Sequence, residues 1–309
     1  MIEIDGLRKE YNNKIVAVAG LHLHLEQGDI YGLIGPNGAG KTTTINMLAG
    51  LLQPTSGTAK IADYDLISQT DKIKRIIGYM PDFFGMYDEL KVWEYLDFFA
   101  MNYSLPNPIR QQVVEDTLQM LHLDFKRDEY VGTLSRGMKQ KLCLGRALIN
   151  DPLVLLLDEP MSGLDPIARI EVKELLLKLK GLNKIIFISS HILSELSQLC
   201  NKIGIIEKGI LLASGGVDVI IKQISTKKNF RLKVSSDRDE AIKAIMAMEK
   251  VSGVIPAEEN EMIIECEEDL DLTQLLEKCI GQHIKIIAFY EEKSSLEDVF
   301  KQISTGTTA

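Results

Sequence analysis

The sequence predicts an α/β fold, and three features of the chain support this fold class. Apolar runs at residues 30–34, 153–157 and 185–190 have the length and composition of strands buried on both faces of a parallel sheet. Helical periodicity dominates residues 83–149, between the first run and the second. A polar stretch at 225–229 then precedes a second set of short strands and helices. We therefore expect an α/β core with an inserted helical subdomain, and a small C-terminal α+β domain.

A phosphate-binding loop follows the first apolar run. Residues 35–42 match the pattern G-x-x-x-x-G-K-[ST], and a helix is expected to start at Lys41. Glycines let successive backbone N–H groups point at phosphate oxygens, and the helix N-terminus favours the anion. We expect Lys41 to reach the outer phosphates of a nucleotide and Thr42 to ligate a bridging Mg²⁺. The expected nucleotide-binding residues are Gly35, Pro36, Asn37, Gly38, Ala39, Gly40, Lys41, Thr42 and Thr43.

The loop is shared by GTPases, kinases and ATPases, so other residues must indicate the nucleotide. A guanine-specific GTPase is expected to carry an Asn-Lys-x-Asp segment that reads the base. The segments beginning at Asn183 and Asn201 both start with Asn-Lys and both lack the final Asp. GTP is therefore disfavoured.

Two carboxylates come directly after the second apolar run, where the carboxyl end of a buried strand meets its ligands. We expect Asp158 to hold the metal through a water, and Glu159 to accept a proton from the attacking water or to orient it. The alternative is a solvated acidic turn, which the upstream phosphate loop disfavours. His191 follows the third run, and we expect it to contact the terminal phosphate.

These motifs together resemble the ATP-binding cassette (ABC) family over roughly the first 220 residues. The segment 134–138, Leu-Ser-Arg-Gly-Met, looks like the family's signature motif, and His191 looks like its switch histidine. The resemblance implies a P-loop NTPase (RecA-like) core, ATP hydrolysis with Mg²⁺, and stacking of Tyr11 on adenine. Residues that resemble the family's D-loop are Ser162, Gly163, Leu164 and Asp165.

The resemblance also implies a head-to-tail pair of cassettes, in which the signature of one subunit meets the terminal phosphate held by the other. Ser135, Arg136, Gly137 and Met138 would then bind ATP in trans. The second ABC subunit would be either another copy of this chain or a similar chain. Ser135 is equally suited to cap the helix that follows it, and the two roles are compatible.

Two segments depart from the family's commonest patterns. The signature is usually Leu-Ser-Gly-Gly-Gln, whereas Arg136 and Met138 stand here, as in a branch dominated by exporters. A third segment, residues 295–300, is not a departure and resembles an ending common in the ABC-2 type exporter branch. Asp82 stands where many members have Gln, and because a carboxylate binds Mg²⁺ we expect Asp82 to be a metal ligand.

Bulk properties exclude several classes of protein. A net charge of -9 and a pI near 5.2 argue against a nucleic-acid partner. The four cysteines lack metal-ligand spacing, which indicates reduced core thiols. No apolar stretch approaches the roughly 20 residues needed to cross a bilayer. If the chain powers transport, we expect a separate transmembrane permease subunit, with this chain cytoplasmic and peripheral on the cytoplasmic face of the cell membrane.

The domain boundaries follow from these patterns. We expect an ABC ATPase domain at 1–224, with its helical subdomain at about 83–149, and an accessory α+β domain at 225–309. Short strands are expected to surround the phosphate loop before residue 80. The aromatic cluster at 83–87 would either dock a helix of a membrane partner or pack in a turn, and docking is favoured.

The C-terminal pattern predicts a split βαβ domain. Its expected strands are 230–234, 253–256, 262–266 and 284–290, and its expected helices are 239–250 and 272–280.

The leading hypothesis is an ATP-binding and ATP-hydrolysing subunit of an ABC transporter, of the ABC-2 exporter type. The alternative is a soluble ABC ATPase acting on ribosomes or nucleic acid. Its DNA-repair branch would insert a long coiled coil, and its ribosome-acting branch usually carries two cassettes in tandem; the sequence has neither. A pure binding module would not need Glu159 and His191.

Overall fold

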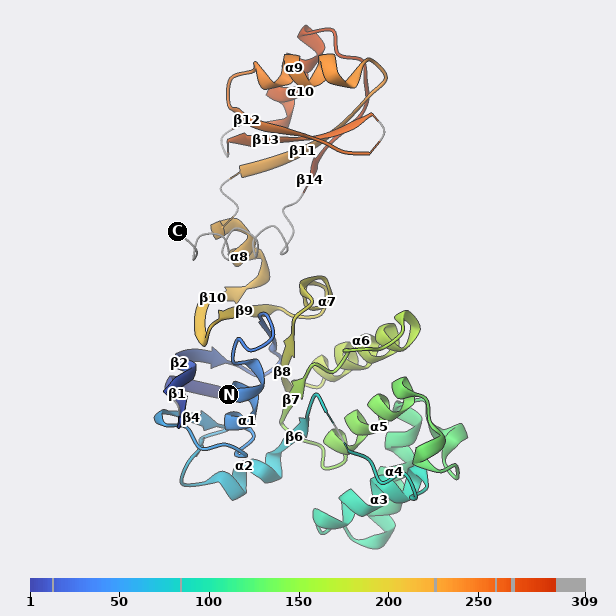
Figure 1. Cartoon of the computed structure of the whole chain (residues 1–309). Helices are drawn as coiled ribbons and strands as arrows, with labels where there is room; N and C mark the ends of the chain where they lie inside the picture. The colour runs from blue at the N-terminus through green and yellow to red at the C-terminus, as the bar shows by residue number, and fades with distance from the viewer. Residues whose placement is uncertain (13, 84, 225–226, 259, 268–269, 293–309) are drawn as a thin grey trace. The chain divides into compact units, whose positions relative to one another are not determined.

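The structure is a computed structural model that describes residues 1–12, 14–83, 85–224, 227–258, 260–267 and 270–292 (Figure 1). The chain forms two compact units, Met1–Val217 and a second unit that starts at Asp218. The tail at 295–300, on which part of the exporter resemblance depends, lies outside the described residues.

The first unit is built on a mainly parallel sheet with the strand order β10-β9-β3-β8-β7-β6. Every residue of β3, β7 and β8 is buried, as the three apolar runs predict. β9 and β10 form an antiparallel hairpin, and the chain turns between them at Lys208 and Gly209, both with positive φ. The strands of this sheet are β3 (Ile30–Ile34), β6 (Ile77–Met80), β7 (Val154–Asp158), β8 (Ile185–Ser190), β9 (Lys202–Glu207) and β10 (Ile210–Gly216).

A second, antiparallel sheet has the order β2-β1-β4-β5. The expectation of only short strands before residue 80 is wrong for β1 and β2, which span 10 and 11 residues. The pairing of these two strands is irregular: its register shifts between Ile4 and Leu7, where Gly6 has a φ of 61°. The strands are β1 (Ile2–Tyr11), β2 (Ile15–Leu25), β4 (Ser56–Ile61) and β5 (Tyr64–Asp65).

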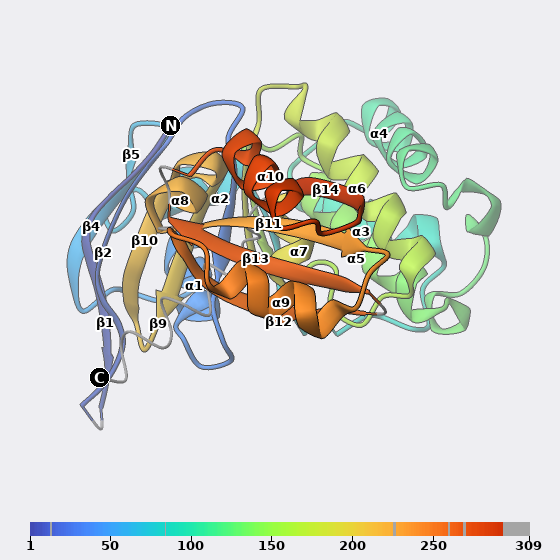
Figure 2. The ribbon, with the colours of Figure 1, turned by 90° about the horizontal axis from the view of Figure 1, so that it is seen from above.

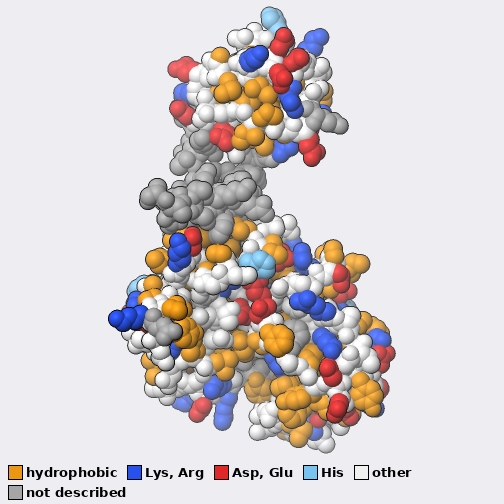
Figure 3. Space-filling model, viewed as in Figure 1, with side chains coloured by type: hydrophobic (Ala, Val, Ile, Leu, Met, Phe, Trp, Pro, Cys, Tyr) orange, Lys and Arg blue, Asp and Glu red, His pale blue; other side chains and the backbone are white. Residues whose placement is uncertain are grey.

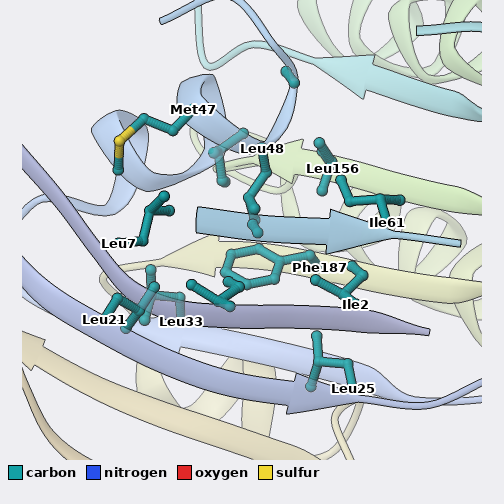
Figure 4. Packing of buried hydrophobic residues seen from close by; sticks show 14 of the residues in the cluster. Ile2, Leu7, Leu21, Leu25, Leu33, Met47, Leu48, Ile61, Leu156 and Phe187 are labelled. Atoms are coloured by element: carbon teal, nitrogen blue, oxygen red, sulfur yellow. The ribbon is translucent and has the colours of Figure 1, made fainter. Parts of the chain in front are cut away.

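Side chains from the two sheets and from α1 (Lys41–Leu48) meet in one hydrophobic core (Figure 4). Phe187 of β8 lies at its centre, and its ring is 5.2 Å from that of Tyr31. Apolar residues of β1 and β2, among them Leu7 and Leu25, cover it from the antiparallel sheet. This packing holds β3, β7 and β8 rigidly, and the predicted site residues follow these strands.

The helical segment forms an arm beside the central sheet (Figure 1). The helical periodicity within 83–149 is present as, among others, α3 (Val92–Asn102) and α4 (Asn107–Met120). α5 packs against β6 and α6, so the arm is joined to the core through the helix that follows the signature segment. The other helices of this unit are α2 (Thr70–Ile76), η1 (Asp124–Lys126), η2 (Val131–Thr133), α5 (Arg136–Leu148), α6 (Pro166–Lys180) and α7 (Leu193–Ser197).

The second unit has the βαββαβ order that the sequence predicts. Its antiparallel sheet has the order β12-β13-β11-β14, and α9 and α10 lie on the same face of it (Figure 2). A separate core of buried residues fills the space between these helices and the sheet. The elements are α8 (Val217–Ile224), β11 (Lys227–Val234), α9 (Arg238–Met246), β12 (Val251–Pro256), β13 (Glu261–Glu267), α10 (Leu272–Gly281) and β14 (Ile286–Glu292).

Cys143, Cys200, Cys266 and Cys279 are buried and free, in agreement with the prediction of core thiols. Burial raises the pKa of Cys143, Cys266 and Cys279 to about 11, so these thiols are poor nucleophiles at neutral pH. Across the described part of the chain, no helix combines the length and apolar character that a bilayer crossing requires.

The central position of Phe187 in the core gives a stability prediction. We expect Phe187→Ala to lower the free energy of unfolding of the first unit by about 3–5 kcal/mol, because it removes a buried ring and leaves a cavity. Urea denaturation followed by circular dichroism measures the change. Phe83→Ala is the matched control, because that ring is 89% exposed and its loss should cost less than about 0.5 kcal/mol. Equal costs for the two variants would contradict the description of the core.

Candidate active site

The phosphate-binding loop is tightly packed at its two ends, Gly35 and Gly40, and open at Gly38 between them. A Cβ on Gly35 would lie 2.2 Å from the Ile206 carbonyl oxygen, and a Cβ on Gly40 would lie 2.3 Å from that of Ala17. Gly38 has a φ of 81°, and its Cβ position meets no atom within 4 Å. The glycines are therefore needed for close packing at the ends of the loop and for a left-handed backbone at its open crest.

Lys41 lies inside this loop, 6% exposed. Its ammonium donates hydrogen bonds to the carbonyl oxygens of Gly35 (2.7 Å) and Pro36 (3.2 Å). The same nitrogen is 3.4 Å from a carboxylate oxygen of Glu159. Thr42 is exposed at the N-terminus of α1 and is available to a ligand.

Asp158 and Glu159 are both buried at the end of β7, and Ser189 of β8 holds them in place. The Ser189 hydroxyl donates to Asp158 Oδ1 (2.5 Å) and accepts from the backbone N–H of Glu159 (2.9 Å). Glu159 itself has a φ of 50°, an uncommon conformation for a residue with a side chain. One hydroxyl on the neighbouring strand therefore fixes both the carboxylate of Asp158 and the backbone that directs Glu159.

The second oxygen of Asp158, Oδ2, is buried and has no hydrogen-bond partner among the described residues. A buried carboxylate oxygen without a partner costs free energy, and a water bound to a divalent cation would remove that cost. A hydroxyl and a carboxylate are the oxygen ligands that Mg²⁺ prefers, so Thr42 and Asp158 fit this ion. Asp82 follows β6, which pairs with β7, and it is exposed. The structure gives Asp82 neither a hydrogen bond nor an ion pair within the residues it describes.

His191 follows β8 and contacts Glu159, as its Nδ1 is 2.9 Å from Oε2. Glu159 therefore lies between the Lys41 ammonium and the His191 imidazole, one carboxylate oxygen facing each. A buried side chain that the sequence analysis missed, Gln140, donates to the carbonyl oxygen of Pro160 (2.7 Å) and fixes the chain just after Glu159. The structure thus brings Lys41, Glu159 and His191 into one cluster.

The signature segment and the residues resembling the D-loop pack together within the chain. Ser135 caps α5 by accepting from the Met138 N–H (3.3 Å), as expected. A Cβ on Gly163 would lie 2.4 Å from the guanidinium carbon of Arg136, so that guanidinium covers the Gly163 backbone. Asp165 caps α6 by accepting from two backbone N–H groups, those of Ile167 and Ala168, both at 3.0 Å.

Arg136 is exposed, while Gly137 and Met138 are half-buried at the start of α5. Tyr11 ends β1 with 43% of its surface exposed and with the Lys9 ammonium 5.4 Å from its ring centre. The contacts expected for Tyr11 with adenine and for the signature with a second subunit stay predictions.

A phosphate loop, an adjacent buried acidic pair and a histidine on neighbouring parallel strands define a P-loop nucleotide-hydrolysing protein. Residues 18–162 match the ABC transporter family, and residues 217–304 match the C-terminal domain of DrrA1-3-like ATP-binding proteins.

Similar proteins support the same assignment. The bacitracin transport ATP-binding protein BcrA of Bacillus licheniformis is 36% identical over 100% of this chain and 98% of its own length. The linearmycin resistance ATP-binding protein LnrL of Bacillus subtilis is 30% identical over 100% of this chain and 99% of its own. A solved ATP-binding subunit of an ABC transporter is 30% identical, with a TM-score of 0.66, and covers 72% of this chain and 92% of that one. The chain belongs to the ABC transporter family and is one of its ATP-binding, ATP-hydrolysing proteins.

The position of Lys41 predicts its effect on nucleotide binding. We expect Lys41→Ala to weaken ATP binding roughly ten- to hundredfold, because it would remove the charge-assisted contact that we expect between Lys41 and the phosphates. Isothermal titration calorimetry with ATP and Mg²⁺ measures the dissociation constant. Lys126→Ala, which removes the same charge from the helical arm, should leave the affinity unchanged. An unchanged affinity in Lys41→Ala would exclude the assigned contact.

Proposed function

We propose that the chain is the ATP-hydrolysing subunit of an ABC exporter of the ABC-2 type, peripheral on the cytoplasmic face of the membrane and acting with a separate transmembrane permease. The observation that carries the hydrolytic part is the placement of the Glu159 carboxylate between the Lys41 ammonium and the His191 imidazole. The names of the relatives, which refer to bacitracin transport and linearmycin resistance, support the export direction.

In this proposal the loop from Gly35 to Thr43 binds the phosphates of ATP through its backbone N–H groups, and Lys41 turns its ammonium from the loop carbonyls toward the outer phosphates. Thr42, Asp158 and Asp82 would hold Mg²⁺, and the ion would neutralise negative charge on the phosphates. Glu159 orients the attacking water and accepts its proton, while His191 contacts the terminal phosphate. Ser189 and Gln140 keep the Glu159 backbone in position.

The completed site needs a second ABC subunit, either a copy of this chain or a similar one. Residues 135–138 of one subunit bind the ATP held by the other, and residues 162–165 lie beside the same interface. We propose the division into an ATPase domain at 1–224, with a helical subdomain at about 83–149, and an accessory domain at 225–309. Binding of ATP joins the two subunits, and its hydrolysis removes the contacts that hold them together.

The helical arm offers a surface for the permease. Exposed aromatic side chains gather on it, and hydrophobic side chains are visible over the arm in Figure 3. Phe83 is almost fully exposed, and the Tyr87 ring packs edge-on against Phe98 at 5.5 Å. A patch of this kind on a protein surface usually marks an interaction site. We therefore propose that this patch docks an apolar segment of the permease.

Replacement of the proposed catalytic carboxylate tests the hydrolytic assignment. We expect Glu159→Gln to bind ATP with unchanged affinity, to lose at least about a hundredfold in turnover and to accumulate as an ATP-bound dimer. Phosphate release and size-exclusion chromatography with ATP measure the two effects. Glu174→Gln, at an exposed position on α6, is the control. Normal turnover by Glu159→Gln would rule out the role assigned to this residue.

The docking proposal is tested in cells that produce the permease. We expect Phe83→Asp/Phe98→Asp to abolish co-purification of a multi-span membrane protein, because two charges enter an apolar contact. The purified variant should retain its basal ATPase activity. Phe125→Asp, at another exposed aromatic position on the arm, serves as the control and should retain the partner. Wild-type protein that captures ribosomes or DNA and never a membrane protein would show the transport assignment to be wrong.

A further inference from the structure

An ion pair outside the proposed catalytic set, between the half-buried Arg169 and the buried Glu195 side chain, joins the segment after Asp165 to the segment after His191. Arg169 is the fourth residue of α6, and Glu195 lies in the short helix α7. The Arg169 Nε is 3.1 Å from Glu195 Oε1. The Nη2 of the same guanidinium donates to the carbonyl oxygen of Leu164 at 3.2 Å. One guanidinium therefore contacts both the D-loop backbone and the helix that follows His191.

The environment makes the charged form of Glu195 dependent on Arg169. The Glu195 side chain is 8% exposed, and its Oε1 and the Arg169 Nε are buried without a hydrogen bond, so their contact is an ion pair. Burial raises the pKa of the Glu195 carboxyl, while the Arg169 charge opposes this effect. A buried carboxylate that loses its ion-pair partner is strongly destabilised in its charged form.

Glu195 is also electrostatically close to the catalytic cluster. The negative charge of Glu159 raises the pKa of the Glu195 carboxyl, while His191 and a hydrogen bond from the Ser190 hydroxyl lower it. His191 is only four residues before Glu195, and its Nδ1 already contacts Glu159. Glu195 therefore offers the His191 imidazole a second negative charge, and the ion pair with Arg169 offsets it.

We propose that the Arg169–Glu195 ion pair is a positioning device that keeps His191 on Glu159 and couples the placement of His191 to the D-loop backbone at Leu164. This inference rests on the proposed function, because it assigns the pair a role in the same hydrolytic site. Neither residue touches the reacting atoms in this role. Movement of the D-loop when a second subunit binds would be transmitted through the guanidinium to α7 and the histidine before it.

The inference predicts a suppressor. Arg169→Met removes the cation paired with the buried Glu195 carboxylate, which still accepts a hydrogen bond from the Ser190 hydroxyl, and we expect that carboxylate to draw His191 away from Glu159. We expect the kcat for ATP to fall at least about tenfold while the KM changes less than about twofold, since misplacement of a reacting group acts on the chemical step. The double variant Arg169→Met/Glu195→Gln also removes the negative charge of Glu195. We therefore expect it to recover most of the lost kcat, although it carries one substitution more than the single variant.

A purely structural ion pair would behave differently. In that case the single and double variants would have equally low kcat values, or the kcat would follow the melting temperature. Arg110→Met is the matched control, because it breaks the Arg110–Asp97 ion pair (2.6 Å) in the helical arm and should not change the kcat. Nuclear magnetic resonance of the imidazole nitrogens gives a readout without turnover. We expect the His191 signals to shift in Arg169→Met and to return toward their wild-type positions in the double variant.

The outcomes separate this inference from the proposed function. If the wild-type protein hydrolyses ATP and Glu159→Gln does not, but Arg169→Met has a normal kcat and unshifted His191 signals, the positioning role is overturned and the proposed function stands. If Glu159→Gln hydrolyses ATP normally, the proposed function fails first. A double variant no more active than Arg169→Met would also overturn the positioning role.

Discussion

The candidate active site of this protein depends on charged side chains that are buried at the carboxyl ends of buried strands. Lys41, Asp158 and Glu159 are each less than 10% exposed, in a region where an unpaired charge is costly. The loop carbonyls, the Ser189 hydroxyl and His191 satisfy most of these charges, and Asp158 Oδ2 is the exception among the described side chains of the cluster. The rigid packing around Phe187 is what allows these groups to be held within hydrogen-bond distance.

Much of the fold could be predicted because local sequence and tertiary structure agree. The three apolar runs are long enough for strands and too short for helices, and the glycine-rich loop between residues 35 and 42 requires a strand before it and a helix after it. The alternation of strands and helices after residue 227 was equally clear. The lengths of β1 and β2 were not predictable, because their bulges near Gly6 interrupt the period-two pattern that marks a long strand.

The sequence predicted the site residues whose side-chain type carries the chemistry. It did not predict the residues that hold those side chains in position through tertiary contacts. Ser189 could have been found, because parallel pairing of two strands that end together places it beside Asp158. Gln140 and the pair of Arg169 and Glu195 gave no such signal. Their partners are backbone carbonyls or side chains on other elements, and those contacts exist only once α5, α6 and α7 are packed. A sequence pattern records residue types at fixed spacing and does not record these tertiary contacts.

Each of the two units has a hydrophobic core of its own. The core between the sheets of the first unit and the core beneath α9 and α10 have no residue in common among those described. Substitutions that reshape one core therefore leave the packing of the other untouched. An ancestral cassette could acquire, replace or lose its appended unit by recombination near residue 217 without any repair of the catalytic interior.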